Sequence, residues 1–253
     1  MLKSLIEIPY QHEQLTFDFG RWYKFITADA ASFGVPSLTT VLGKTKDEES
    51  QQFLAEWQYF DWFDATVQGL DETTAAASIR VGQEMHTLTE NYFLNGEELP
   101  VGKTKAHKMF NTYYDNFLKQ HPIIPLMIEA PLYWTGKNGC GFGGTVDLIA
   151  QVGDEIWLID HKTSGKRKKE DHQSIPEYKM QVVAYAKALK DLFGITVDRC
   201  MINISTTRTF TSFEVDRMDM KDIWQDFYSN RLLKYFEGRH NESLEQRVQQ
   251  ETS

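Results

Sequence analysis

The chain has 253 residues, of which 41% are hydrophobic and 25% are charged, and its formal net charge is −9. No apolar stretch approaches the ~20 residues of a membrane span, and two cysteines, Cys140 and Cys200, exclude a zinc or iron–sulfur site built from four cysteines of this chain. The negative charge argues against a protein that coats nucleic acid through general basicity, and the start MLKSLIEIPYQHEQ, which resembles no secretion signal or presequence, predicts a cytoplasmic protein.

Residues 1–70 are expected to form an extension of strands and helix that packs on the main domain. The first 45 residues or so predict irregular structure or short strands, and Ser37 or Thr39 is suited to cap a short helix near their end. Residues 50–68 predict a helix rich in aromatic side chains, at Trp57, Tyr59, Phe60, Trp62 and Phe63. Because these rings cover every face of the helix, we expect them to pack against the main core, with base stacking as the alternative.

Residues 71–238 are expected to form the main domain, followed by a flexible tail over residues 239–253. A stripe of residues at spacings of three and four predicts a helix over 73–94, with His86 on its buried side. The stripe consists of Ala75, Ile79, Gly82, His86, Glu90 and Phe93. The elements expected after it are a helix at 105–119, strands at 126–134, 144–151 and 155–162, a helix at 177–193, strands at 199–206 and 209–215, and a helix at 220–237. This order predicts a mixed α+β core and not a Rossmann repeat.

The strongest chemical signal is a hairpin over residues 144–162. Gly153-Asp154 suits a two-residue type II′ turn, which would place Asp147 directly opposite Asp160. Two facing carboxylates repel one another, and Lys162, two residues beyond Asp160, projects to the same face as that residue. A shared divalent cation would reverse the repulsion, and oxygen ligands suit Mg²⁺ or Mn²⁺. The alternative is a surface salt-bridge cluster, which the apolar neighbours of both strands argue against.

Glu129 is a third acid, in the otherwise apolar segment 126–134. It is a candidate to bind a metal directly, to act through water, or to contact a backbone amide. Pro131 predicts that this strand lies at a sheet edge or carries a bulge, so its register against the hairpin is not predicted.

Asp147 in one strand and Asp160-His161-Lys162 in the next resemble the signature of the PD-(D/E)XK nuclease superfamily. Three further features resemble the RecB-type branch of this superfamily. They are the upstream His86, the segment Gly143-Gly144-Thr145-Val146-Asp147, and the segment Gln181-Val182-Val183-Ala184-Tyr185. With Pro36-Ser37-Leu38-Thr39 and Thr163-Ser164 added, the pattern is most similar to the family of the mitochondrial genome maintenance exonuclease and its phage and bacterial relatives. The resemblance covers roughly residues 36–190, and the lack of a presequence favours a phage or bacterial member.

The resemblance implies a restriction-endonuclease-like core and specific residue roles. His86, Asp147, Asp160 and the main-chain carbonyl of His161 would bind the metal, and Lys162 would orient or help deprotonate the attacking water and stabilise charge on the phosphate. Gln181 and Tyr185 lie one helical turn apart, so both are expected to reach the site, where they would position the helix on the hairpin and contact substrate. The position of the polar segment directly after Lys162, rather than the resemblance, predicts contacts with substrate phosphates, and an ordinary solvated surface is the alternative. The residues expected to make these contacts are Thr163, Ser164, Lys166, Arg167, Lys168 and Lys169.

The resemblance further implies a Mg²⁺- or Mn²⁺-dependent exonuclease without an iron–sulfur cluster, acting on single-stranded or flap DNA ends in replication, recombination or repair. A single-strand-binding, annealing or helicase protein would be its partner. Two alternatives remain open from the sequence: an exonuclease that resects double-strand ends, of the phage-recombination type, and a catalytically dead DNA-binding module. Intact Asp147, Asp160 and Lys162 argue against the second.

Overall fold

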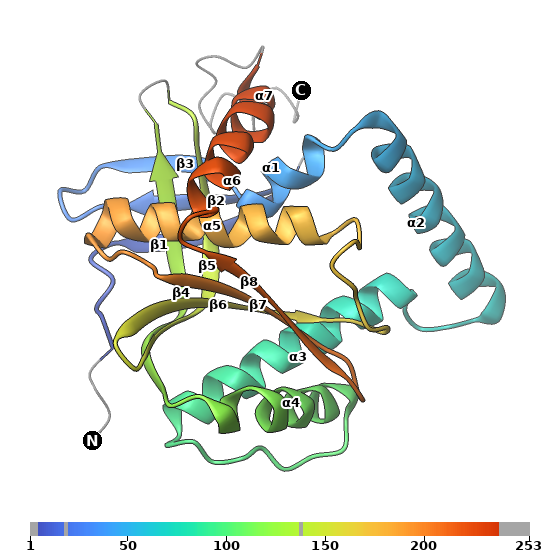
Figure 1. Cartoon of the computed structure of the whole chain (residues 1–253). Coiled ribbons are helices and arrows are strands. Elements are labelled where there is room, and N and C mark those ends of the chain that lie inside the picture. Colours follow the sequence, from blue (N-terminus) through green and yellow to red (C-terminus); the bar gives the residue numbers. More distant parts are fainter. Residues whose placement is uncertain (1–4, 18–19, 137–138, 238–253) are drawn as a thin grey trace.

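The computed structural model describes residues 5–17, 20–136 and 139–237, and the tail expected over 239–253 lies outside these described residues. Within them the chain forms two separate sheets and a set of helices around the larger sheet (Figure 1). No helix in the described ranges is long and apolar enough to cross a membrane.

The larger sheet has five strands in the order β4-β5-β6-β7-β8. Its strands are β4 (Ile123–Thr135), β5 (Gly141–Val152), β6 (Glu155–Thr163), β7 (Arg199–Ser205) and β8 (Phe210–Asp216). Only the β6/β7 pair is parallel, and the crossover between these two strands is α5 (Ile175–Phe193). The predicted mixed α+β core is therefore confirmed. β4 lies at an edge of the sheet, as Pro131 predicted, and carries a register shift between Pro125 and Met127.

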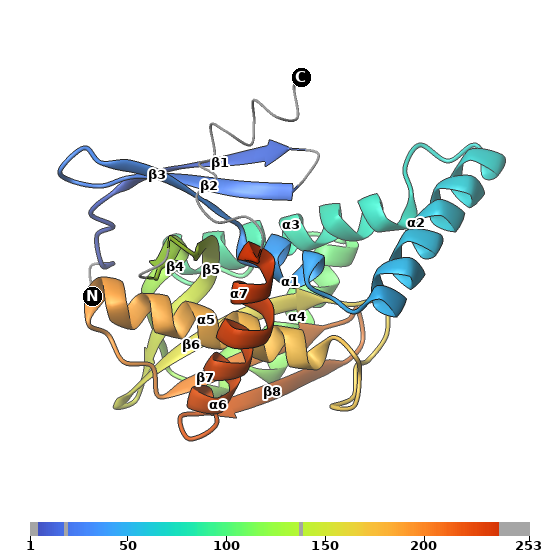
Figure 2. The same ribbon diagram turned by 90° about the horizontal axis from the view of Figure 1, so that it is seen from above.

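Helices cover both faces of the larger sheet, and an apolar core fills each interface (Figures 1 and 2). On one face α5 packs with the C-terminal helices α6 (Met220–Asp226) and α7 (Leu233–Phe236), which a π-helical segment, Phe227–Leu232, joins. On the other face lie α3 (Thr74–Leu94), α4 (Lys105–Asn116) and the short 3-10 helix Leu118–Gln120. Successive side chains of a strand point to opposite faces of the sheet and so contribute to both cores. In β6, for example, Leu158 faces α5 and Ile159 faces α3 and α4.

The N-terminal segment forms an ordered antiparallel sheet where irregular structure or short strand pieces were expected. Its strands are β1 (Gln11–Phe17), β2 (Gly20–Ile26) and β3 (Ser32–Pro36), and α1 (Leu38–Lys44) follows directly. Ser37 caps α1 by accepting a hydrogen bond from the Thr40 backbone N–H, as the sequence indicated. Ser37 also forms a β-bridge with Gly143, which attaches this sheet to β5.

Helix α2 (Glu48–Gln68) forms where predicted, but its aromatic side chains do not pack against the main core. Ala65 is the only buried residue among those described in this helix, and Trp57, Tyr59, Phe60, Trp62 and Phe63 are all exposed. The helix projects from the body and returns through α3 (Figure 2). The expectation of core packing was wrong because the helix contacts mainly the first turn of α3, where Asp61 accepts hydrogen bonds from the backbone N–H groups of Thr74 and Ala75. Ile79, which was expected on the buried stripe of α3, is also exposed.

The β5/β6 hairpin has the predicted register over its outer half. Val152 pairs with Glu155 and Ile149 with Leu158, around a turn at Gly153. Gly153 has a φ of +62°, which glycine adopts without steric cost and which the first central position of a type II′ turn requires.

Candidate active site

The candidate site lies where the strand pairing of β4 and β5 is interrupted. The ladder runs from Ile128↔Leu148 to Ala130↔Val146 and passes over Glu129 and Asp147 between them. Glu129 has a φ of +45°, a left-handed conformation that residues with a Cβ rarely adopt and that costs about 1–3 kcal/mol. The interruption turns both carboxylates toward α3.

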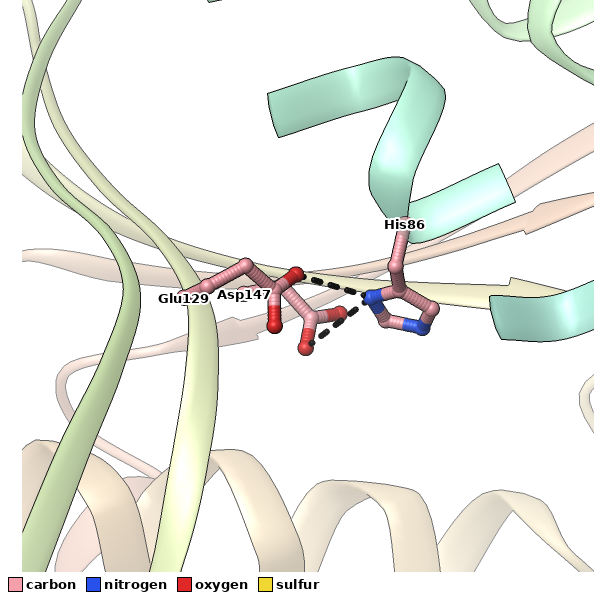
Figure 3. Close-up of side chains that lie close together, drawn as sticks. All are labelled: His86, Glu129 and Asp147. Carbon is pink, nitrogen blue, oxygen red and sulfur yellow. Dashed lines mark hydrogen bonds and ion pairs between the residues drawn. The ribbon is translucent and has the colours of Figure 1, made fainter. Parts of the chain in front are cut away.

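Helix α3 carries His86 to these two carboxylates (Figure 3). The His86 Nδ1 atom lies 3.0 Å from Glu129 Oε1 and 3.6 Å from Asp147 Oδ1. One ligand atom from each of the three residues lies within 4.8 Å of the other two, a grouping that suits a metal ion. Gly82, one turn before His86, lies beside the end of β6, where a Cβ would be in ordinary van der Waals contact with Thr163 Oγ1 at 3.5 Å.

The last part of β6 supplies a second charged pair. The Lys162 ammonium lies 2.8 Å from both carboxylate oxygens of Asp160, although only Oδ1 has hydrogen-bond geometry. Asp160 and Lys162 follow Leu158 on the α5 face, and Lys162 lies 5.4 Å from the Tyr178 ring centre of α5. Asp160 Oδ2 is therefore a buried carboxylate oxygen without a hydrogen-bond donor among the described residues.

Asp147 does not pair directly with Asp160, which corrects the expected cross-strand arrangement. The β5/β6 ladder ends at Leu148↔Ile159, one residue short of the two acids. Asp147 Oδ2 instead accepts a hydrogen bond of 2.6 Å from the His161 backbone N–H, so its carboxylate fills the gap where the strands separate. The His161 ring points to the other face, against the Tyr113 ring of α4.

The basic groups of the site are held in their charged forms. The negative charge of Asp147, with help from Glu129, raises the pKa of His86 to about 9 against the opposing effect of burial. Burial lowers the pKa of Lys162, but attraction to Asp160 and Asp147 outweighs it and leaves the pKa raised. Lys162 is thus an ammonium ion at neutral pH, which suits it to a role as a fixed positive charge.

The buried carboxyl groups show the opposite tendency. Burial raises the pKa of Asp147, although His86 and Lys162 oppose it. Burial likewise raises the pKa of Asp160 to about 6, with Asp147 adding to the rise and Lys162 opposing it. Burial also lowers the pKa of His161 well below its usual value, so its ring is neutral. Three carboxyl groups thus share two basic groups at the gap, and a bound cation would favour their ionised forms.

Gln181 and Tyr185 lie on the α5 side of the hairpin and are both buried. Tyr185 packs α5 against β5 next to Gly144, where any Cβ would collide with the Tyr185 ring, and Gln181 hydrogen-bonds with Tyr185. Burial raises the pKa of Tyr185, and the nearby charges of Asp160 and Asp147 contribute. The structure therefore brings both residues next to the candidate site, in positions shielded from solvent.

The basic segment after β6 divides into two parts. Lys166, Arg167 and Lys169 are exposed, whereas Lys168 folds back and donates to the hydroxyl groups of Ser174 and Tyr178. Ser164 shapes the loop by donating to the Lys166 carbonyl, and Thr163 ends β6 beside Gly82 of α3. Three cations of this loop are thus free to meet a ligand, while Lys168 stays at the site.

The sequence reasoning missed two aromatic residues of the site. Tyr178 lies between two cations, 5.4 Å from Lys162 Nζ and 5.3 Å from Lys168 Nζ, measured to its ring centre. Its spacing of three from Gln181 and seven from Tyr185 is a signal that could have placed it on the same helix face. Tyr113 packs on His161 from α4, and no local pattern connects these two residues.

Comparison with known proteins agrees with this geometry. A family model of the PD-(D/E)XK nuclease superfamily matches residues 100–199, which include β4, β5, β6 and α5. The match indicates a metal-dependent nuclease and, with the five-stranded mixed sheet, a PD-(D/E)XK nuclease fold. No curated protein matches the chain. A solved structure titled "Crystal structure of SSO0001" is similar at 15% sequence identity and a TM-score of 0.37, over 77% of this chain and 75% of that one, too distant a likeness to bear on function.

Proposed function

We propose that this protein hydrolyses phosphodiester bonds of DNA with the help of a divalent metal ion. The observation that carries the proposal is the convergence of His86, Glu129 and Asp147 beside the buried Lys162–Asp160 pair. This set combines hard oxygen ligands, one imidazole and a fixed positive charge within a single interruption of the sheet.

The residues present fit a divalent cation. Three potential ligand atoms already lie within 4.8 Å of one another, and Asp160 offers a buried oxygen that lacks a hydrogen-bond donor. We propose His86, Asp147, Asp160 and the His161 main-chain carbonyl as ligands, and the contact between His86 and Glu129 adds Glu129 to this set. A bound Mg²⁺ or Mn²⁺ ion would supply positive charge for the phosphate and make a nearby water more acidic.

Lys162 is proposed to act on the phosphate through its charge. Its raised pKa disfavours a general base, and its contact with Asp160 fixes the position of the ammonium group. Tyr178 contacts Lys162 from α5 and limits the movement of its side chain. A charge held in this way stabilises the developing negative charge of a phosphoryl transition state without reorganisation.

The remaining predicted residues are proposed to hold the substrate or the site itself. Lys166, Arg167 and Lys169 are exposed cations next to the strand that carries Lys162, as a contact with the DNA backbone requires. Thr163 and Ser164 directly follow Lys162 in the chain, and Lys168 contacts Tyr178, which also contacts Lys162. Gln181 and Tyr185 are both buried, and Tyr185 contacts Gly144 of the hairpin, so we propose that they position α5 on the hairpin as well as contact substrate.

The finer function rests on the sequence resemblance. The motif residues around His86, Asp147, Asp160-His161-Lys162 and Gln181 through Tyr185 support a RecB-type exonuclease similar to the mitochondrial genome maintenance exonuclease family. On this basis we propose action at single-stranded or flap ends of DNA, in replication, recombination or repair, together with a single-strand-binding, annealing or helicase protein.

Cleavage time courses on labelled DNA test this proposal. Linear single-stranded, duplex and flap substrates labelled at the 5′ or the 3′ end are compared with a circular single strand, each with Mg²⁺, Mn²⁺ or EDTA. We expect stepwise shortening of single-stranded and flap ends that depends on metal, with the circle intact. Preference for duplex ends would support the resection alternative, cleavage of the circle would exclude an exonuclease, and binding without any cleavage would identify a dead module.

A further inference from the structure

Helix α2 carries an exposed apolar stripe that the candidate site does not use. We define the α2 stripe as Phe53, Phe60, Phe63 and Val67, whose spacings of seven, three and four are those of a and d positions in a coiled coil. Their exposed fractions are 62%, 60%, 47% and 68%. Exposed apolar residues that line up in this way mark an interaction surface.

The stripe faces away from the rest of the chain. Asp61 accepts hydrogen bonds from the first turn of α3, and Ala65 is the one buried residue described in α2. Both lie on the opposite side of the helix from the stripe. The ring contacts of Tyr59 are likewise to other α2 residues, namely Phe60, Trp62 and Phe63. In Figure 2 the helix stands out from the body of the molecule. Among the described residues, nothing outside α2 covers the stripe.

The negative charge of α2 indicates which class of molecule the stripe can bind. Glu48, Glu49, Glu56, Asp61 and Asp64 lie in the helix, which contains no lysine or arginine. Nucleic-acid phosphates and anionic lipid surfaces would be repelled by these carboxylates, and an amphipathic membrane-surface helix normally carries lysine or arginine on its polar face. Charge complementarity therefore favours a cationic partner.

A second copy of the chain fits poorly for the same reason. An antiparallel pair of α2 helices centred on the stripe would bring Glu56 of one copy toward Asp64 of the other, and a parallel pair would align identical acids. Like charges at the flanks of an apolar seam oppose pairing.

We propose that the α2 stripe docks an amphipathic helix of a partner protein whose apolar face is flanked by lysine or arginine. The spacing of the stripe matches the apolar seam of such a helix, and Glu56, which lies between Phe53 and Phe60 on the same face, pairs with one of its cations. The partner binds outside the candidate active site, so this docking is independent of catalysis.

The test uses two synthetic 21-residue helical peptides with leucine at a and d positions, one with lysine at e and g and the other with glutamate there. Binding is measured by calorimetry to the wild-type protein, to Phe60→Ser/Phe63→Ser and to Met218→Ser, which removes an even more exposed apolar side chain elsewhere. We expect the lysine peptide to bind at least tenfold more tightly than the glutamate peptide. The double variant should weaken this binding at least tenfold, and Met218→Ser should leave it unchanged. DNA cleavage should be unchanged in both variants, so failure here is distinct from failure of the nuclease proposal.

Three results would overturn the inference. The first is that the wild-type protein does not bind the lysine peptide, or that the double variant binds it as tightly as the wild type does. The second is a dimer in sedimentation equilibrium that dissociates in the double variant, because the occupant would then be a second copy. The third is loss of oligothymidylate binding in the double variant, which would identify a nucleic-acid surface. Phe53→Ser/Val67→Ser repeats each comparison if thermal melting shows that the first double variant is unfolded.

Discussion

The His86 Nδ1 atom lies 3.0 Å from Glu129 Oε1, and the backbone of Glu129 holds a φ of +45° in making this contact. A left-handed glutamate in a strand is unfavourable, so the surrounding sheet must impose it. The stability of the sheet thus offsets a strained backbone at Glu129, which points the Glu129 carboxylate toward α3.

Replacing Glu129 should therefore separate stability from function. Glu129→Gly and Glu129→Gln both remove the charge, but only glycine relieves the backbone. We expect metal affinity and cleavage to fall in both variants, while the unfolding free energy of Glu129→Gly exceeds that of Glu129→Gln by about 1 kcal/mol. Urea denaturation and metal titration measure the two effects. A lower stability for the glycine variant would contradict the argument from φ.

Lys162→Ala should affect turnover far more than binding. The substitution removes a charge held close to the site, an effect of about 2.7–4 kcal/mol for comparable preorganised groups, so turnover should fall by two or more orders of magnitude. DNA affinity should barely change. Single-turnover rates and equilibrium binding give the two quantities, and circular dichroism checks the fold, because the change leaves Asp160 without its cation. A loss confined to affinity would show that Lys162 binds DNA without acting on the reacting phosphate.

Removing the metal should stop cleavage and leave the fold intact. The sheet has an apolar core on each face, formed without a metal ligand, so its stability does not depend on the ion. Activity should vanish in EDTA and return with Mg²⁺ or Mn²⁺, while the far-ultraviolet circular dichroism spectrum stays the same. Unfolding by the chelator would instead identify a structural metal.

The exposed loop cations should control the salt dependence of DNA binding. Each phosphate contact on a single strand contributes about 0.7 to the slope of log affinity against log salt. Replacing Lys166, Arg167 and Lys169 together with alanine should lower this slope by about 2 and leave saturating turnover unchanged. A triple variant at Lys103, Lys119 and Lys221, which are exposed elsewhere, serves as the control. An unaltered slope would place the DNA path away from the loop.

The junction of α2 and α3 should weaken in acid. Hydrogen bonds, first from the Ala75 backbone N–H, lower the pKa of Asp61 in the folded protein. A depressed folded-state pKa stabilises the fold above the unfolded value of about 4, and this contribution is lost as the pH falls through the folded value. Asp61→Ala should thus lower the urea midpoint near neutral pH, and the difference should vanish in acid. Asp64→Ala, also in α2, should show no such difference.

Local patterns in the sequence were sufficient for much of the framework. The dipeptide Gly153-Asp154 determines the turn, and the turn determines the register of Val152 with Glu155 because paired strands alternate strictly. The spacing of Gly82 and His86 placed them on one side of a helix, and Pro131 indicated an edge strand. Each of these depends on residues close together in the chain.

Only the tertiary structure decided how the carboxylates meet and where α2 lies. The hairpin register predicted from the turn pairs Asp147 with Asp160, but the ladder ends one residue earlier. At that point Asp147 lies against His86 of α3 and accepts a hydrogen bond from the His161 backbone N–H. Likewise, the rings of α2 predicted burial, yet they are exposed, and α2 is joined to the first turn of α3 by hydrogen bonds to Asp61. Both outcomes depend on contacts between elements distant in sequence, which hydrophobic periodicity and turn chemistry do not encode.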